Sequence, residues 1–260
     1  METPEPEILR PSWWRNSALW AGFCTRKGGY GTGVFAELNC SWKWKEEGFG
    51  ADENHDLLAR KEGYDRKRLF LVKQVHGSNG VSTERYPPEV SIRTAGDFLI
   101  SGTPGDVCGV ITADCVPLLI YDPVAPCVAA VHSGWRGTLA RVAASAVVAL
   151  KESYGSNPAH MKVAAGPSIG VCCFEVGRDV EMKFQEAFPS LEGFSSTGQR
   201  GRPHIDLCKV IYRTLEDSGV IRENIEVVGG CTFCRPESYF SYRRDGSPIG
   251  QHMSFIGLKL

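Results

Sequence analysis

Two side chains that could carry metal or nucleophilic chemistry, Cys115 and His132, stand at the ends of neighbouring apolar runs. Cys115 precedes the run 116–121, and His132 follows the run 127–131, with an Asp-Pro turn signal between the two runs. This pattern predicts a β-hairpin or a pair of adjacent strands. In an antiparallel pair these two ends lie side by side, so we expect the thiol and the imidazole to meet at one edge of a sheet.

A second imidazole comes from upstream, because His76 closes the apolar run 69–75. Two imidazoles and one thiolate, with a fourth position free, form the ligand set of a catalytic zinc site. His76, Cys115 and His132 are too far apart in sequence for a local zinc finger, so a sheet must gather them. Zinc would lower the pKa of a bound water towards about 7, and Asp114 is a candidate proton shuttle or orienting partner. Taken singly, each side chain could instead be a structural residue at a strand end.

The residues after His132 add a candidate anion site. Ser133 has the side chain of an N-cap, and the apolar spacing predicts a helix over 137–151. Trp135 and Arg136 then lie near a helix N-terminus, where free N–H groups and a guanidinium suit a phosphate.

Two further stretches could border a ligand pocket. Arg26 begins the glycine-rich stretch 26–33, which fits neither the Walker nor the Rossmann pattern. It is either a flexible turn or a loop over a ligand, with Arg26 as a charged contact. The stretch 240–246 is basic and aromatic, and it either lines a pocket or ends a strand.

Two other interpretations of the same residues stay open. In the first, Cys115 is a thiolate nucleophile with His132 as its base, which predicts an amidase or deamidase without a metal. In the second, Cys231 or Cys234 of a Cys-x-x-Cys segment supplies a fourth metal ligand. A closed four-ligand site would make the chain a zinc-stabilised interaction module rather than an enzyme.

Composition narrows the setting. The chain has 260 residues and a net charge of −1, so nothing indicates a general attraction to nucleic acid or membranes. It contains no apolar run of about 18 residues and no signal-peptide pattern, so we expect a cytoplasmic protein. Ten cysteines without regular pairs do not predict a disulfide framework.

The periodicity predicts one domain over 19–260, preceded by a loose N-terminal arm over 1–18. Helices are expected over 52–64, 137–151, 175–188 and 206–218, and 193–203 is expected to be a mobile surface loop. His55, on the first helix, is expected to face solvent. The nearly continuous apolar runs indicate strands covered on both faces. These strands are expected at 19–25, 69–75, 97–101, 107–112, 116–121, 127–131, 161–165, 225–228 and 252–258.

Five motifs, in order along the chain, resemble those of the laccase-domain family, also described as YfiH-like or as multicopper polyphenol oxidoreductases. They are Lys73-Gln74-Val75-His76-Gly77, Ala113-Asp114-Cys115-Val116-Pro117, His132-Ser133-Gly134-Trp135-Arg136-Gly137, Gly166-Pro167-Ser168-Ile169-Gly170 and Phe240-Ser241-Tyr242-Arg243-Arg244-Asp245-Gly246. The resemblance runs from about Gly22 to the C-terminus. It implies an α+β fold of mixed β-sheets sandwiched by helices, with an architecture like that of YfiH.

The resemblance also implies a metal, zinc or else copper, held by His76, Cys115 and His132. The implied activities are purine nucleoside phosphorolysis, on adenosine, inosine, guanosine and methylthioadenosine, and hydrolytic deamination of adenosine. The family is also linked to peptidoglycan-precursor editing, which would suit the Cys–His hydrolase. Its older name implies copper-dependent oxidation of phenols, but six histidines are few for several coppers.

The substrate side of this site is expected to involve Arg26, Asn39, Arg136 and Arg243, with an aromatic ring of the stretch 240–246 stacked on the purine. Cys115, His76, His132 and Asp114 are the expected catalytic residues. The expected partners are a small purine nucleoside and phosphate. We expect a monomer or a weak homodimer.

Overall fold

Two packed β-sheets form the centre of the protein in a computed structural model, which describes residues 5–15, 18–43, 49–198 and 201–260. The first sheet is mixed: β3 runs parallel to β6, and the other pairs are antiparallel. Its five strands, in spatial order, are β1 (Ile8–Leu9), β2 (Leu19–Cys24), β13 (His252–Leu258), β6 (Val107–Thr112) and β3 (Leu69–Phe70).

The second sheet is also mixed, because its two edge pairs, β12–β9 and β4–β5, are parallel and the pairs between them are antiparallel. Its six strands, in spatial order, are β12 (Ile225–Val227), β9 (Lys162–Ala165), β7 (Val116–Asp122), β8 (Cys127–Ser133), β5 (Phe98–Ser101) and β4 (Gly80–Ser82). The predicted hairpin of 116–121 and 127–131 is therefore confirmed as β7 and β8.

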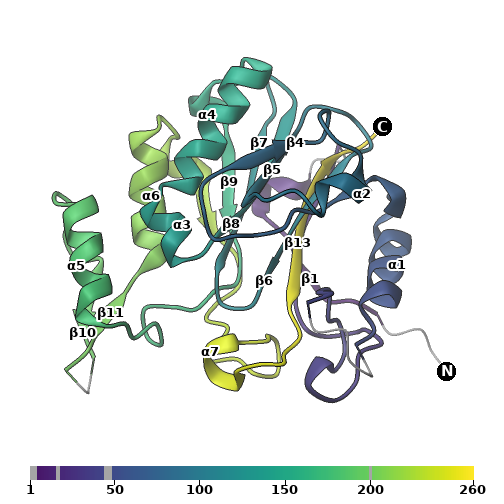
Figure 1. The fold of residues 1–260 in the computed structure, drawn as a ribbon. Coiled ribbons are helices and arrows are strands. Elements are labelled where there is room, and N and C mark those ends of the chain that lie inside the picture. The colour runs from purple at the N-terminus through teal and green to yellow at the C-terminus, as the bar shows by residue number, and fades with distance from the viewer. Residues whose placement is uncertain (1–4, 16–17, 44–48, 199–200) are drawn as a thin grey trace.

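Helices cover the outer faces of both sheets, as Figure 1 shows. Against the six-stranded sheet lie α4 (Val142–Tyr154), α5 (Arg178–Ala187) and α6 (Leu207–Asp217), and against the five-stranded sheet lies α1 (Ala51–Glu62). The shorter helices are α2 (Pro88–Ser91), α3 (Trp135–Leu139) and α7 (Tyr242–Asp245). The predicted α+β arrangement of mixed sheets between helices is confirmed.

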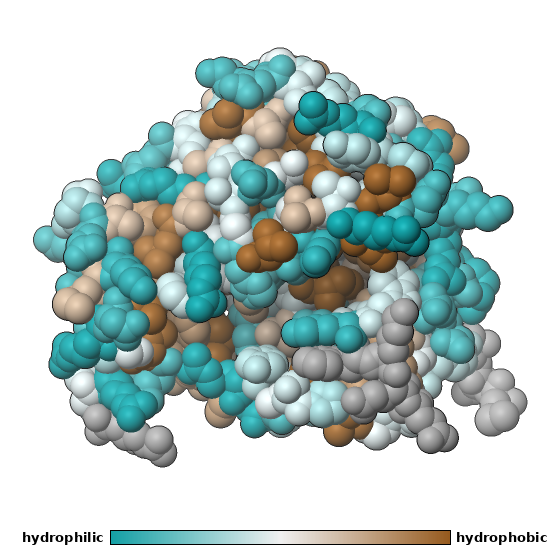
Figure 2. All heavy atoms as spheres, in the orientation of Figure 1, coloured by the Kyte–Doolittle hydropathy of each residue, from teal (hydrophilic) through white to brown (hydrophobic). Residues whose placement is uncertain are grey.

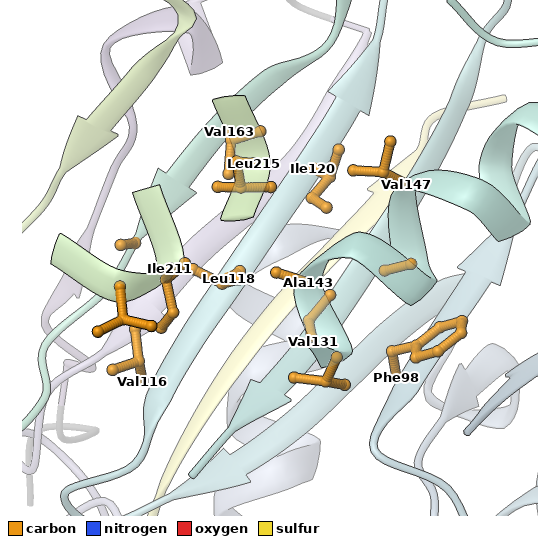
Figure 3. Packing of buried hydrophobic residues seen from close by; sticks show 14 of the residues in the cluster. Phe98, Val116, Leu118, Ile120, Val131, Ala143, Val147, Val163, Ile211 and Leu215 are labelled. Carbon is orange, nitrogen blue, oxygen red and sulfur yellow. The ribbon is translucent and has the colours of Figure 1, made fainter. Parts of the chain in front are cut away.

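Strict alternation along the strands builds these layers. In β7, Leu118 and Ile120 pack towards the helices, whereas Leu119 and Tyr121 pack between the two sheets. Figure 3 shows the helix side, where Ile211 of α6 and other apolar side chains of α4 and α6 lie on the strands. Because both faces of β7 are covered, its sequence is an unbroken apolar run.

The helix predicted over 137–151 is wrong in its extent, because the structure divides it into α3 and α4. Arg141 stands between them with a φ of 57° in the left-handed region, which ends the helical geometry. Ser133 is not the N-cap: it ends β8, and Gly134 takes the cap position. The Ser133 hydroxyl pairs instead with Thr138 Oγ1 at 2.9 Å.

The strand predicted over 69–75 is only two residues long. Beyond β3 the chain leaves the sheet, and the side chain of Gln74 takes over the hydrogen bonds of a neighbouring strand. Its Nε2 donates to Ile111 O at 2.7 Å, and its Oε1 accepts from Ile111 N at 2.8 Å. The side-chain amide thus satisfies the backbone groups of β6 while the chain turns towards His76.

The expectation that His55 faces solvent is wrong. Its ring is 0% exposed, stacks on Trp42 at 4.2 Å between centroids, and bonds through Nε2 to Cys40 O at 2.7 Å. His55 is buried although its helix is polar, because the segment that carries Cys40 and Trp42 covers its ring.

The predicted N-terminal arm is not loose in the residues that the structure describes, because β1 pairs with β2. The rings of Trp13 and Trp14 pack against the core between the sheets. The division of the chain at residue 18 into an arm and one domain stays a prediction. In the stretch 193–203, the structure describes two short paired strands, β10 (Ser195–Thr197) and β11 (Pro203–Ile205).

On the face drawn in Figure 2, hydrophilic residues dominate the outline, and hydrophobic residues gather near a hollow towards the middle. None of the helices in the described part of the chain has the length and apolar character that a bilayer span requires.

Candidate functional site

The β7–β8 register brings the thiol and the imidazole to the same edge of the sheet. Val116 lies opposite Ser133 and Pro117 opposite His132, so Cys115 ends beside His132. His76 reaches the same point from the segment after β3. The ligand atoms of His76, Cys115 and His132 all lie within 4.8 Å of one another. We call these three residues the rim group.

A buried carboxylate that sequence reasoning missed holds the rim group together. Asp97 is 0% exposed and lies just before β5, the strand beside β8. Its Oδ1 accepts hydrogen bonds from His132 Nδ1 and from His76 N, both at 2.8 Å, and its Oδ2 accepts from Gly77 N at 2.6 Å. The available signal was an aspartate at the start of an apolar strand, but only the pairing of β5 with β8 shows which histidine it meets.

The backbone around the rim group adopts conformations that are uncommon for residues with side chains. His76 has a φ of 61° and Asp114, next to Cys115, a φ of 91°. Gly134 lies against the group, because a Cβ there would stand 2.9 Å from Cys115 Sγ and 3.0 Å from His76 Cδ2. Backbone strain of this kind accumulates where the surrounding structure over-determines a functional geometry.

The electrostatics of the rim group favour a thiolate beside an imidazolium. Burial alone would raise the pKa of Cys115, but the charge of His132 and hydrogen bonds from both histidines outweigh it and lower that pKa to about 6. Burial would lower the pKa of His132, but Cys115 and Asp97 raise it to about 9. Burial also opposes ionisation of Asp97, yet its hydrogen bonds from His132 and Gly77 lower its pKa.

The rim group fits a metal ion by its chemistry. Because Asp97 binds Nδ1 of His132, that imidazole has its Nε2 left for a metal, the arrangement usual for metal-ligating histidines. Two imidazoles and a thiol suit both zinc and copper. His132 is buried, Cys115 is half-buried and His76 is exposed, so the group is reached from the side of His76.

Asp114 is not free to move protons in this structure, because both of its oxygens are engaged. Thr232 Oγ1 donates to Oδ1 at 2.6 Å, and the backbone N–H of Arg243 donates to Oδ2 at 2.7 Å. Of the two predicted roles for Asp114, this geometry favours positioning, since it ties the residue before Cys115 to two later loops.

Two predicted substrate arginines border the loops around 236–243. The guanidinium of Arg243 donates to Glu175 O at 2.7 Å and lies 5.3 Å from the Phe174 ring. The guanidinium of Arg26 donates to Pro236 O at 3.0 Å and lies 4.6 Å from the Phe240 ring. Phe240 is 1% exposed and Tyr242 is 55% exposed, so Tyr242 is the ring of the stretch 240–246 that is open to a ligand, and its stacking on a purine stays a prediction.

Arg136 is exposed and has no ion pair with a described carboxylate. Its guanidinium lies 4.3 Å from the ring of Trp135. The helix that carries it, α3, is only five residues long. The expected help from a helix dipole therefore largely falls away, and the predicted anion site rests on the guanidinium itself.

Asn39 lies away from any ligand surface, which argues against its predicted substrate contact. It is 0% exposed, and its Nδ2 donates to Phe49 O at 2.9 Å. Its Oδ1 accepts from Ser41 N at 3.1 Å and Gln251 N at 3.0 Å. With its amide used on both sides, Asn39 fixes the loop before α1 to the start of β13.

The predicted fourth ligand from Cys231 or Cys234 does not join the rim group. Both thiols gather instead with Cys172 and Cys173. Among the described residues, no other group of metal-binding side chains contains a histidine. His55 and His252 are buried and bonded to backbone carbonyls. The histidines required for an oxygen-reducing copper cluster are therefore not gathered there.

The fold and the rim group together define an α+β protein with a candidate metal centre at the rim of two packed mixed sheets. The model of one family, described as "Multi-copper polyphenol oxidoreductase laccase", matches residues 20–259. The chain belongs to this family, as its five motifs predicted.

Relatives and a solved structure agree with this assignment. The chain is 32% identical to "Purine nucleoside phosphorylase YfiH" of Escherichia coli over 97% of this chain and 99% of that protein. It is also 32% identical to "Purine nucleoside phosphorylase LACC1" of Mus musculus, over 92% of this chain but only 55% of that longer protein. The crystal structure of the hypothetical protein YfiH of Bacillus licheniformis superposes with a TM-score of 0.89 at 31% identity. That match covers 99% of this chain and 98% of the other.

Proposed function

We propose that the protein is a zinc-dependent purine nucleoside phosphorylase that also deaminates adenosine by hydrolysis. The observation that carries this proposal is the rim group itself, with Asp97 on one imidazole, in a chain matched over 97% of its length by a relative named purine nucleoside phosphorylase. Adenosine, inosine, guanosine and methylthioadenosine are the proposed substrates. A cytoplasmic location and a monomeric or weakly dimeric state stay predictions.

The two aspartates beside the rim group position the residues that would hold the metal. Bound zinc would supply a Lewis acid that activates water or polarises a substrate oxygen. Asp97 holds the tautomer and the angle of His132, and its bonds to the backbone of His76 and Gly77 fix the approach of His76. Asp114 holds the residue before Cys115 in place through Thr232 and Arg243.

Phosphorolysis also requires a place for the phosphate, and the exposed guanidinium of Arg136 is our candidate for it. Arg136 follows Gly134, which lies against Cys115, so its backbone starts close to the rim group. Arg243 and Arg26 are the other proposed cationic contacts, although each already donates to a backbone carbonyl. A planar guanidinium without a carboxylate partner is well suited to phosphate.

The proposal is tested by incubating the purified protein with adenosine, with and without inorganic phosphate. Phosphorolysis converts adenosine and phosphate to adenine and ribose 1-phosphate, whereas deamination converts adenosine and water to inosine and ammonia. We expect inosine in both cases, and adenine only when phosphate is present, together with hypoxanthine from phosphorolysis of the inosine. Protein that contains zinc and forms neither product would refute the proposal.

A second candidate function is a Cys–His hydrolase, such as an amidase that edits peptidoglycan precursors. The specific observation in its favour is the chain Asp97–His132–Cys115, in which a carboxylate orients the imidazole beside a thiol of lowered pKa. The two candidates differ in their need for metal. A hydrolase of this kind keeps its activity after chelation, whereas the proposed phosphorylase loses it and recovers with added zinc.

A further inference from the structure

Four cysteines far apart in sequence converge outside the rim group. Cys172 and Cys173 lie between β9 and α5, and Cys231 and Cys234 lie between β12 and α7. The four sulfur atoms all lie within 4.8 Å of one another. We call these four residues the thiol group. The sequence signals, an adjacent pair of cysteines and one Cys-x-x-Cys segment, do not show by themselves that the two loops meet.

The spacing of the sulfur atoms is that of ligands around one ion. Cys173 Sγ and Cys234 Sγ are 3.3 Å apart, and Cys172 Sγ and Cys234 Sγ are 3.7 Å apart. A disulfide would bring two sulfurs to about 2.05 Å. Zinc–sulfur bonds of about 2.3 Å in a tetrahedron place neighbouring sulfurs about 3.8 Å apart.

The backbone is arranged to let the sulfurs approach. The N–H of Gly170 donates to Cys231 Sγ at 3.3 Å, and hydrogen bonds to sulfur are a common support for metal-bound thiolates. A Cβ on Gly170 would stand 3.2 Å from Cys172 Sγ, so a side chain at this position would press on the group. The donors are four soft sulfurs, which select zinc over the hard cations that prefer oxygen.

We propose that the thiol group binds one zinc ion in a closed, structural site. All four ligands come from the protein, so no coordination position remains for water or substrate. The site is separate from the rim group and does not depend on the function proposed for it.

The consequence of this second ion lies in the loop between its ligands. Thr232, between Cys231 and Cys234, donates from its backbone N–H to Ser168 O at 3.0 Å and from its hydroxyl to Asp114 Oδ1 at 2.6 Å. Asp114 precedes Cys115 of the rim group. Zinc bound to Cys231 and Cys234 would therefore hold Thr232 in place. Because Thr232 bonds to Asp114, the zinc would also support the rim group indirectly.

The exposure of two of the thiols gives a direct test on the unmodified protein. Cys172 and Cys234 are exposed, so iodoacetamide reaches both sulfur atoms unless a metal holds them. We expect peptide mapping to show slow alkylation of all four cysteines in native protein and rapid alkylation of Cys172 and Cys234 after a chelator is added. Equal alkylation of these two thiols with and without chelator would overturn the proposal.

Metal analysis of variants provides the second test. Cys173→Ser with Cys234→Ser should lower the bound zinc by about one equivalent per chain, and the loss should be the same in a Cys115→Ala background. Cys208→Ser is the matched control, because this half-buried cysteine of α6 lies outside the thiol group and should leave the zinc content unchanged. Cobalt added to the Cys115→Ala protein should give the intense absorption of tetrahedral cobalt thiolate.

Two results would contradict the second zinc site in these experiments. One is an unchanged zinc content in the Cys173→Ser, Cys234→Ser protein. The other is a native mass and thiol titration showing that the four cysteines form disulfides. Loss of nucleoside turnover alone bears on the function proposed for the rim group, whereas these readouts follow the thiol group only.

Discussion

The rim group and the thiol group gather metal-binding side chains in different ways. Cys115 and His132 of the rim group stand on a hairpin whose strands, β7 and β8, are buried on both faces in the middle of a sheet, and His76 joins them from the segment after β3. The thiol group stands on two loops, and two of its four residues are exposed. The rim group has a buried carboxylate, Asp97, on one of its imidazoles, whereas the supporting hydrogen bond to the thiol group comes from the backbone of Gly170.

This difference predicts different tasks for the two proposed ions. Three ligands of mixed type on a rigid support leave a coordination position for a reacting molecule, as catalytic zinc sites do. Four thiols from two loops close the coordination and join the loops, as structural zinc sites do. We therefore expect changes in the rim group to reduce turnover and changes in the thiol group to reduce stability.

Replacing the rim thiol should have the largest effect. In Cys115→Ala we expect a loss of more than about 100-fold in nucleoside turnover and of about one zinc equivalent, because the ligand itself is removed. The melting temperature should change little, since Cys115 lies at the edge of the sheet. Cys173→Ser should show the reverse pattern, with a lower melting temperature and a smaller loss of turnover. Comparable turnover losses with no melting shift in either variant would remove the distinction between the two groups.

Removing the charge of the carboxylate behind His132 should have the next largest effect. Asp97→Asn should weaken zinc binding by about 10- to 100-fold, because the negative charge behind His132 is lost and an amide nitrogen in place of Oδ2 cannot accept from Gly77 N. Asp122→Asn is the matched control. Asp122 is also 0% exposed, but it accepts from Val124 N at the far end of β7. The control should lose stability and keep its zinc affinity, as measured by competition with a chelator. Equal zinc affinities in the two variants would contradict the role of Asp97.

A methyl group beside the rim group should act without removing any ligand. Gly134→Ala should weaken zinc binding about tenfold or more, since its Cβ would press on Cys115 Sγ and His76 Cδ2. Gly77→Ala is the matched control, because a Cβ there would meet Asp97 Oδ2 at 3.5 Å, an ordinary contact distance. Titration of the metal-free variants with zinc would show the difference. Similar zinc affinities in the two variants would mean that the short distance from Gly134 to Cys115 and His76 does not affect metal binding.

Arg136→Ala tests the proposed binding of phosphate by the Arg136 guanidinium. Phosphorolysis of adenosine should fall about tenfold in kcat/KM, mainly through the KM for phosphate, because a charge-assisted bond is lost. Deamination uses no phosphate and should change little. Arg141→Ala, whose guanidinium donates to Ala187 O and lies over Phe188, serves as the control. Equal losses in the two reactions of Arg136→Ala would reject the phosphate role.

The last expected effect is on stability at low pH, where His252 holds Phe240, in the segment that follows Cys234. His252 accepts from Phe240 N at Nε2 and donates from Nδ1 to Thr112 O, so it must be neutral when folded. Burial lowers its pKa to about 3, below the value near 6.5 of an unfolded histidine. The unfolded state therefore takes up the proton first, and stability is lost as the pH falls from about 6.5 towards 3.

Between pH 7 and pH 5, protonation of His252 in the unfolded state should lower the free energy of unfolding by about 2 kcal/mol. Denaturant unfolding of the metal-free protein would measure the loss. His252→Asn should flatten the pH dependence, whereas His160→Asn, at an exposed position, should leave the slope unchanged. An unaltered slope in His252→Asn would show that another group controls the acid lability.

The sequence predicted the elements whose patterns are strongest. β6 and β13 lie at the expected residues, and α6 begins after Asp206, whose side chain caps it by accepting from Lys209 N at 3.0 Å. The apolar runs that became β7 and β8 also predicted which two side chains meet at their ends. For β7 and β8 the local pattern sufficed, because both strands are apolar on both faces and they pair with each other as neighbours in the chain.

What the sequence could not predict depends on contacts between distant segments. Asp97 meets His132 only because β5 pairs with β8, and the four cysteines meet only because β9 pairs with β12. The burial of His55 follows from a loop that folds over it and not from its own helix. Asn39 looked like a ligand contact by its chemistry, but its amide is used within the fold.

An anomalous difference map recorded across the zinc absorption edge would test the rim centre most directly, on crystals of enzyme that turns over adenosine. We predict a peak bonded to Cys115 Sγ at about 2.3 Å and to nitrogens of His76 and His132 at about 2.0–2.1 Å. Fully active crystals without a peak between these three side chains would contradict the proposal that zinc acts there.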